Sequence, residues 1–264
     1  MPHNIALAAT GFALIFAGTT LGAATVLMVR REPSARMHSL MLGFAAGMMI
    51  AASMWSLLMP AIQSAAPTYG QLSWLPAALG FIGGGLFLVL LDQVVPHIHQ
   101  GSQHEEGPQA HISKTLKFFL AVTIHNIPEG LAVGFAFGGA AAHPDGAASM
   151  SALALALGIA LQNLPEGAAV ALPMHSITHS RPRAFLFGMG SGAVEPLAAL
   201  LGYLMAAQLT ALLPWLMAFA AGAMIFVVAE DLIPDANLRD DSHFGTWGVM
   251  AGFAIMMVLD IALG

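Results

Sequence analysis

The chain has 264 residues, of which 58% are hydrophobic and 8% are charged, and its formal net charge is -6. This composition is too apolar for a soluble globular domain and indicates an integral membrane protein with a lipid bilayer around it and no nucleic-acid partner. The sequence has no cysteine, which excludes disulfides and thiolate metal sites and agrees with a location in a bacterial inner membrane.

The apolar residues fall into long continuous stretches. Each stretch approaches the about 20 residues that a helix needs to cross the hydrocarbon layer, and none alternates as the strands of a β-barrel would. We therefore expect an all-α integral membrane protein, with a single transmembrane domain over residues 1–264 and eight spans. The expected spans are residues 5–29, 39–62, 74–96, 116–138, 149–175, 185–207, 212–234 and 246–263.

The basic residues predict the orientation of these spans, because all of them follow spans of odd number. They are Arg30, Arg31 and Arg36 after the first span, Lys114 and Lys117 after the third, Arg181 and Arg183 after the fifth, and Arg239 after the seventh. Links rich in Lys and Arg face the cytoplasm, so both termini are expected to be extracytoplasmic. The first stretch has basic residues after it and none before it, which favours a retained span over a cleaved signal peptide.

Glycine pairs at four-residue spacing recur in the spans. Two small residues one turn apart let the backbones of neighbouring helices approach closely. The pairs predict a compact bundle, and they are Gly18 and Gly22, Gly43 and Gly47, Gly80 and Gly84, Gly134 and Gly138, and Gly248 and Gly252.

The link at residues 97–115 differs from the others because it is polar and rich in histidine. We expect a cytoplasmic loop, which is either a solvated connector or a loose capture site for a transition metal. Its candidate ligands are His97, His99, His104 and His111.

Two copies of one motif lie in the fourth and fifth spans. They read His-Asn-Ile-Pro-Glu-Gly at residues 125–130 and Gln-Asn-Leu-Pro-Glu-Gly at residues 162–167. In each copy a histidine or an amide lies four residues before a glutamate, so the two side chains project from one face of a helix and a cation could bind between them. The motifs make His125, Asn126, Glu129, Gln162, Asn163 and Glu166 candidate metal ligands.

Further carboxylates lie within the spans, although no Lys or Arg lies at the depth of the central ones. A buried carboxylate costs about 3 kcal/mol on insertion scales, so these groups are expected to be protonated or to meet a cation from outside. Glu195 lies near the middle of the sixth span and joins the candidate site. Asp92, Glu230 and Asp231 lie at cytoplasmic ends and are candidates for an exit pathway, and Met49 and Ser53 could line the same route.

With these residues the chain resembles the ZIP family of divalent-metal transporters, and most closely its bacterial GufA-like branch. The resemblance covers nearly the whole length. It rests on the two proline motifs, on Gly-Ala-Val-Glu-Pro at residues 192–196, on Glu-Asp-Leu-Ile-Pro at residues 230–234, and on eight spans with a histidine-bearing loop after the third.

The resemblance implies a homodimer that moves zinc, and often iron, manganese or cadmium, into the cytoplasm through a binuclear site at mid-membrane. These metals would be its substrates and not cofactors. By motif, one metal would be held by His125, Glu129, Gln162 and Glu166, and a second by Asn126, Asn163 and Glu195 with Glu129 and Glu166 shared. Met49 would be an extra ligand, and Asp92 and Glu230 would fit the exit.

One residue departs from the family pattern, since many relatives have a histidine where this chain has Gln162. An amide is a poorer zinc ligand than an imidazole, so we expect a weaker or less selective site. Two other functions stay open at this stage. An intramembrane metal-dependent hydrolase could use similar ligands, although His-Glu-x-x-His is absent, and a proton or cation channel would need no alternating access.

Overall fold

The computed structural model describes residues 2–28, 33–97, 107–108, 113–141, 147–238 and 243–263. Within these ranges the chain forms eight helical segments that are long and apolar enough to cross a membrane, which confirms the predicted class of fold. The segments are Asn4–Met28, Ala35–Leu72, Trp74–Val94, Thr115–Ala140, Ala147–Thr178, Arg181–Gln208, Thr210–Ala236 and Phe244–Leu263.

Three of the segments consist of more than one helix: turns of other helix types lie within two of them, and a turn at Ala193 divides the third. The α-helices are α1 (Pro2–Met28), α2 (Ala35–Ala52), α3 (Met59–Tyr69), α4 (Trp74–Val94), α5 (Lys114–Ala140), α6 (Ala147–Thr178), α7 (Arg181–Gly192), α8 (Val194–Gln208), α9 (Leu213–Val227), α10 (Ile233–Leu238) and α11 (Phe244–Leu263). Short 3-10 turns cover Gly70–Leu72 and Thr210–Leu212. Two π-helical turns, Ser53–Leu58 and Val228–Leu232, join α2 to α3 and α9 to α10.

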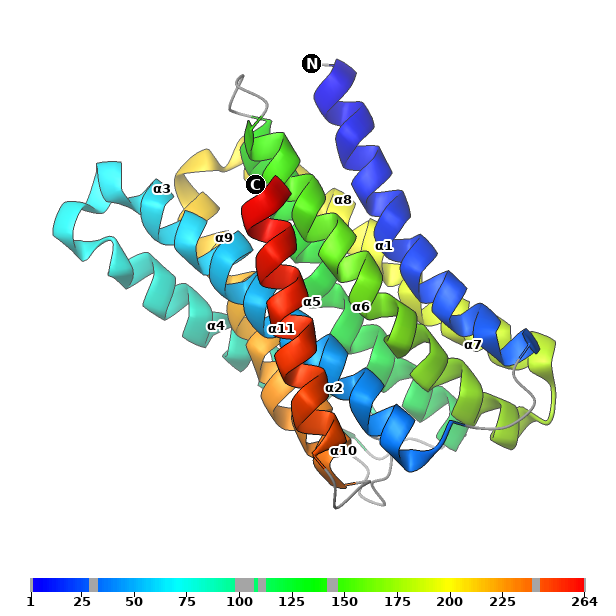
Figure 1. The fold of residues 1–264 in the computed structure, drawn as a ribbon. Helices are drawn as coiled ribbons and strands as arrows, with labels where there is room; N and C mark the ends of the chain where they lie inside the picture. Colours follow the sequence, from blue (N-terminus) through cyan, green and yellow to red (C-terminus); the bar gives the residue numbers. More distant parts are fainter. Residues whose placement is uncertain are drawn as a thin grey trace.

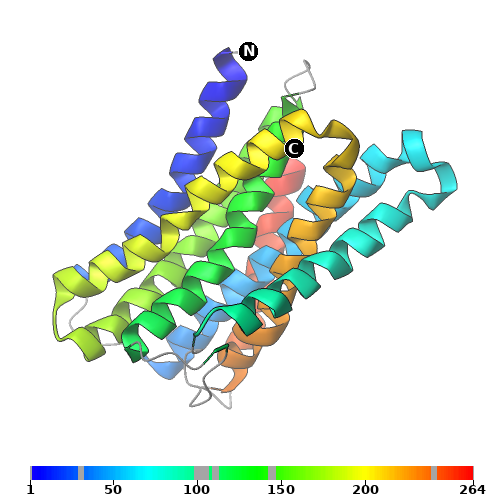
Figure 2. The same cartoon turned by 180° about the vertical axis from the view of Figure 1, so that it is seen from behind.

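The helices form two groups that lie side by side. In the first group α1 packs on α6 and α7, while α5 packs on α8 and α6. In the second group α2 packs on α11 and α4 packs on α9. Contacts of α5 with α9 and of α2 with α6 join the groups, and Figures 1 and 2 show α1 and α4 on opposite sides of the bundle. The N-terminal end of α1 and the C-terminal end of α11 lie at the same end of the bundle (Figures 1 and 2).

The predicted glycine pairs lie where helix backbones come closest. At each of the ten glycines a Cβ atom would lie less than 3.0 Å from a backbone atom of the neighbouring helix. Gly18 and Gly22 face α6, the pairs in α2 and α11 face each other, Gly80 and Gly84 face α9, and Gly134 and Gly138 face α8. The contacts within each group are therefore made largely backbone to backbone, which accounts for the compact bundle.

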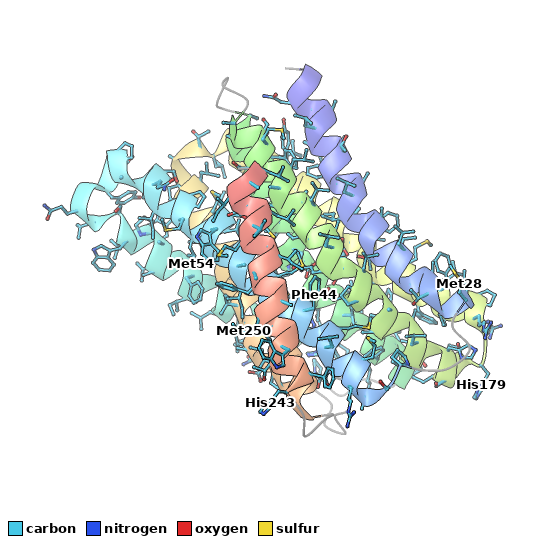
Figure 3. All side chains as sticks on the ribbon, viewed as in Figure 1. Met28, Phe44, Met54, His179, His243 and Met250 are labelled. Atoms are coloured by element: carbon cyan, nitrogen blue, oxygen red, sulfur yellow. The ribbon has the colours of Figure 1, made fainter. Side chains whose placement is uncertain are left out.

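The outer surface of the bundle is apolar. Large exposed side chains include Leu79, Ile82, Leu86 and Leu90 along one face of α4. Met54 and Met250, labelled in Figure 3, are also exposed, with 48% and 60% of their surface accessible. An apolar exterior over the length of the spans is what contact with lipid chains requires.

Candidate metal site

The two proline motifs meet because α5 and α6 are consecutive antiparallel helices in contact. Each helix continues through its motif proline, Pro128 or Pro165. The amide Nε2 of Gln162 donates a hydrogen bond of 2.8 Å to Oε1 of Glu129, and both side chains are almost fully buried. The two motifs therefore meet inside the bundle.

Glu129 of α5 and Glu166 of α6 both line one cavity at this crossing. Two carboxylates that share a small cavity repel each other unless a proton or a cation lies near them. The structure thus brings together two candidate ligands that the sequence places 37 positions apart.

A cavity of about 80 Å³ opens next to this pair. Its polar lining comes from α5, α6, the second π-helical turn and α10. The titratable and amide side chains that line it are His125, Asn126, Glu129, Glu166, Asp231 and Asp235. Four of the predicted core residues thus share one cavity.

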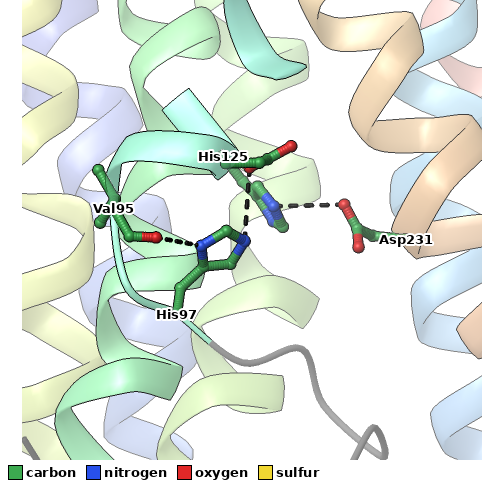
Figure 4. A network of polar contacts seen from close by, with 5 residues as sticks. Val95, His97, His125 and Asp231 are labelled. Carbon is green, nitrogen blue, oxygen red and sulfur yellow. Dashed lines mark hydrogen bonds and ion pairs between the residues drawn. The ribbon is translucent and has the colours of Figure 1, made fainter. Parts of the chain in front are cut away.

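The imidazole of His125 faces the second group of helices across this cavity. Its Nε2 lies 3.3 Å from Oδ2 of Asp231, and the two side chains are 17% and 15% exposed. Figure 4 shows the two facing one another. A carboxylate in this place orients the ring and leaves one edge of each side chain accessible from the cavity.

The remaining core candidates lie behind the cavity wall in a hydrogen-bonded network. Glu195 is fully buried, and its carboxylate accepts three hydrogen bonds. Oε1 accepts from the hydroxyl of Thr19 at 2.6 Å and from Nδ2 of Asn126 at 3.2 Å. Oε2 accepts from Nδ2 of Asn163 at 2.8 Å. Three helices, α1, α5 and α6, thus converge on one carboxylate.

Several oxygen atoms at the crossing of α5 and α6 are buried without a hydrogen-bond donor in the described part of the chain. They are Asn126 Oδ1, Glu129 Oε2, Gln162 Oε1 and Asn163 Oδ1. Within the described ranges no three His, Cys, Asp or Glu side chains are grouped so that they could hold a metal ion by themselves. Three of the four oxygen atoms without donors belong to amide groups, so amide oxygens are available to complete a metal site here.

The two exit candidates at the end of the seventh span lie in different surroundings. Asp231 lines the cavity, whereas Glu230 is exposed and does not line it. Neighbouring residues of a helical turn point in different directions, so the two carboxylates face different ways. Asp231 is the one of the two that lies close to His125.

The other pathway candidates lie outside this cavity. Met49 and Ser53 are buried to within 1% and do not line it. Asp92 lies at the end of α4, where its Oδ1 is 3.4 Å from Nε2 of His97. His97 is fully buried, and its Nδ1 lies 2.8 Å from the carbonyl oxygen of Val95 (Figure 4). His97 therefore caps the end of α4, and the other loop histidines, His99, His104 and His111, lie outside the described residues.

A second cavity, of about 500 Å³, lies beyond Glu129 toward the other end of α5. Gly139 and Ala140 of α5 line it, together with Asp260 of α11. Asp260 accepts a hydrogen bond of 2.7 Å from the hydroxyl of Ser56 in the first π-helical turn. The candidate site is thus placed between two cavities that lie toward opposite ends of the bundle.

Two residues of the site were not predicted. Asp235 lines the first cavity one turn after Asp231, and the spacing of the two was a usable signal, since residues four apart share a face. Thr19 donates to Glu195 from α1. No sequence pattern marks Thr19, because its partner Glu195 lies on another helix 176 positions away in the sequence.

Comparison with known proteins bears on the function of this arrangement. The model of the ZIP zinc transporter family matches residues 99–260, more than half of the chain. The chain is 40% identical to the zinc transporter ZIPB of Bordetella bronchiseptica, over 99% of this chain and 82% of that one. It is 37% identical to the zinc transporter GufA of Myxococcus xanthus, over 96% and 98% of the two chains. It is 33% identical to the human zinc transporter ZIP11 over 94% of each chain.

The chain belongs to the ZIP family of zinc transporters. Metal-ion transport by a multi-pass membrane protein is therefore its class of function. ZIP proteins are transporters and not enzymes, which argues against the alternative function of an intramembrane metal-dependent hydrolase.

Proposed function

We propose that this ZIP protein carries zinc, and also iron(II), manganese and cadmium, into the cytoplasm through a binuclear site at the crossing of α5 and α6. The observation that carries the proposal is the set of four buried oxygen atoms without donors at this crossing. A buried acceptor without a donor costs free energy, and a divalent cation would satisfy several acceptors at once. The donor set contains imidazole, carboxylate and amide groups, which suits these metals.

Within the proposed site the ligands divide by position. His125, Glu129, Gln162 and Glu166 would hold the first ion, and Asn126 and Asn163 would turn their oxygens to the second, with the two glutamates shared. Glu195 lies beside the second ion in this arrangement. Glu129 and Glu166 line the same cavity, which supports the sharing, because a cation between the two carboxylates removes their repulsion.

We further propose a homodimer in a bacterial inner membrane, with both termini outside the cytoplasm and residues 1–264 forming one transport domain. The bacterial relatives and the positions of the basic residues support this orientation. In this orientation the cavity lined by Asp231 faces the cytoplasm and the cavity lined by Asp260 faces outward. Asp92 and the loop histidines would then lie on the cytoplasmic side, where they could collect released metal.

The proposal is tested by uptake of radioactive zinc into liposomes that contain the purified protein, with protein-free liposomes as control. We expect uptake that saturates with zinc concentration and that iron(II), manganese and cadmium inhibit more strongly than magnesium. Uptake that rises without saturation would favour the channel alternative. No uptake above the protein-free control would overturn the proposal.

Replacing Gln162 by histidine should increase the preference for zinc. The amide of Gln162 now donates to Glu129, and an imidazole can keep that donation while it offers its second nitrogen to the metal. We expect the half-saturating zinc concentration to fall about tenfold, as for one added strong ligand contact of about 1.4 kcal/mol. Competition between zinc and manganese in the uptake assay measures the change. An unaltered order of metals would mean that position 162 does not contact the ion.

The neighbouring carboxylates of the second π-helical turn offer a matched pair of variants. Asp231→Asn should slow zinc uptake several-fold, because it removes the charge that faces His125 across the cavity. Glu230→Gln removes an equal charge one residue away, on an exposed side chain, and should leave uptake near the wild-type rate. Initial rates at saturating zinc compare the two. Equal losses in both variants would show that the charge acts at long range and not within the cavity.

A further inference from the structure

Thr19 of α1 is packed closely against two glycines: Gly167, which ends the second proline motif, and Gly192, which begins the Gly-Ala-Val-Glu-Pro segment. Its side chain is 2% exposed. A Cβ atom at Gly192 would collide with the Thr19 side chain, and one at Gly167 would collide with its backbone. A β-branched side chain has few rotamers, so this contact restricts the direction of the hydroxyl. The hydroxyl oxygen lies 2.6 Å from Oε1 of Glu195 and 3.5 Å from the carbonyl oxygen of Ile15, so its shorter hydrogen bond is to Glu195.

Glu195 in turn determines how the two asparagines of the motifs are oriented. Nδ2 of Asn126 donates to Glu195 and also to the carbonyl oxygen of Ser191 at 3.0 Å. Nδ2 of Asn163 donates to Glu195 and also to the carbonyl oxygen of Ile15 at 3.2 Å. Carbonyl and ionised carboxylate oxygens only accept, so the nitrogen side of each amide must face them.

The oxygen side of each amide consequently points the other way. Asn126 Oδ1 and Asn163 Oδ1 are the two amide oxygens that lack donors in the described structure. A flip of either amide would place its oxygen against the Glu195 carboxylate, where two acceptors repel each other. The network therefore selects the orientation in which both oxygens are available to a cation.

We propose that Thr19 is a positioning residue for the second metal, because it holds the Glu195 carboxylate that orients Asn126 and Asn163. This inference rests on the proposed function of the site. Glu195 accepts three hydrogen bonds on its two oxygens, and the two amide oxygens are turned toward the ion. Thr19 contributes by holding the carboxylate in place from α1, without touching the metal.

The test compares Thr19→Val, which removes the hydroxyl and keeps the shape, with Thr19→Ser, which keeps the hydroxyl. Thr25→Val is the matched control, because Thr25 lies on the same helix and its hydroxyl bonds only to the carbonyl of Gly22, at 2.7 Å, among the described residues. Zinc uptake is measured against concentration in liposomes, and the melting temperature of each purified variant is measured alongside. If Thr19→Val is not recovered from membranes, Thr19→Ala against Thr19→Ser measures the same hydroxyl.

We expect Thr19→Val to raise the half-saturating zinc concentration about tenfold, the usual effect of losing one hydrogen bond to a charged group. The maximal rate and the melting temperature should match those of Thr25→Val, and Thr19→Ser should behave like the wild type. A half-saturating concentration equal to that of Thr25→Val would overturn the inference. A lower melting temperature with unchanged half-saturation would also overturn it, since Thr19 would then be structural. Failure of the proposed function would be separate, because the wild type itself would show no saturable uptake.

Discussion

Glu129→Ala abolishes saturable zinc uptake while the protein remains in the membrane: this is the largest effect that we expect from a single substitution in the site. Glu129 is the residue at which the two motifs join. Its Oε1 accepts from Gln162, its Oε2 has no donor among the described residues, and its side chain lines the same cavity as Glu166. Removing it takes away the ligand that both proposed ions share.

The expected loss in uptake rate is more than about a hundredfold, because even residues that only support a metal ligand cost 10- to 100-fold when they are removed. Radioactive uptake in liposomes measures it, with Glu230→Ala as a control that also deletes a carboxylate, but an exposed one. The amount of each protein in the liposomes must be equal. Wild-type uptake in Glu129→Ala would place the ion path elsewhere in the bundle.

The second large effect concerns the fold, and three consecutive glycines of α4 allow a controlled test. A Cβ atom at Gly84 would collide with the backbone of α9 at Phe219 and Ala223. At Gly83 and Gly85 the nearest atoms to a Cβ are ring carbons at 3.9 and 3.7 Å, which is ordinary contact. We therefore expect Gly84→Ala to destabilise the protein by about 1–3 kcal/mol, the range for overpacking a tight contact.

Gly83→Ala and Gly85→Ala should leave stability unchanged or raise it by up to about 1 kcal/mol, since alanine favours the helix over glycine. Thermal unfolding of the three purified variants in one detergent measures the differences. If all three variants melted together, the close approach of α4 and α9 would not contribute to the stability of the bundle.

Much of the fold could be predicted because its signals are local in sequence. Span length is a property of single segments, and the glycine pairs lie at one-turn spacing whatever helix faces them. The two motifs could be predicted for the same reason, since His125 and Glu129 share a helix face by spacing alone. Their meeting followed from α5 and α6 being consecutive, which makes antiparallel contact the default.

Other parts of the site depend on contacts between distant segments and carry no such signal. Thr19 matters through Glu195, which is 176 positions away in the sequence. The choice of Asp231 over Glu230 depends on the turn in which they lie, which is π-helical. The sequence shows both carboxylates, but it does not show the local rise and rotation of the helix that aims one of them inward.

The second π-helical turn also bears on how the cavity tolerates a change in the number of residues in the chain. A π-helical turn holds roughly one residue more than an α-helical turn. Deleting Ala229 would therefore return Val228–Leu232 to α-helical geometry and leave the helix after it near its present orientation. A deletion inside α9 has no extra residue to remove, so it would rotate everything after it by about 100°. Asp231 and Asp235 would then leave the cavity without any change to either side chain.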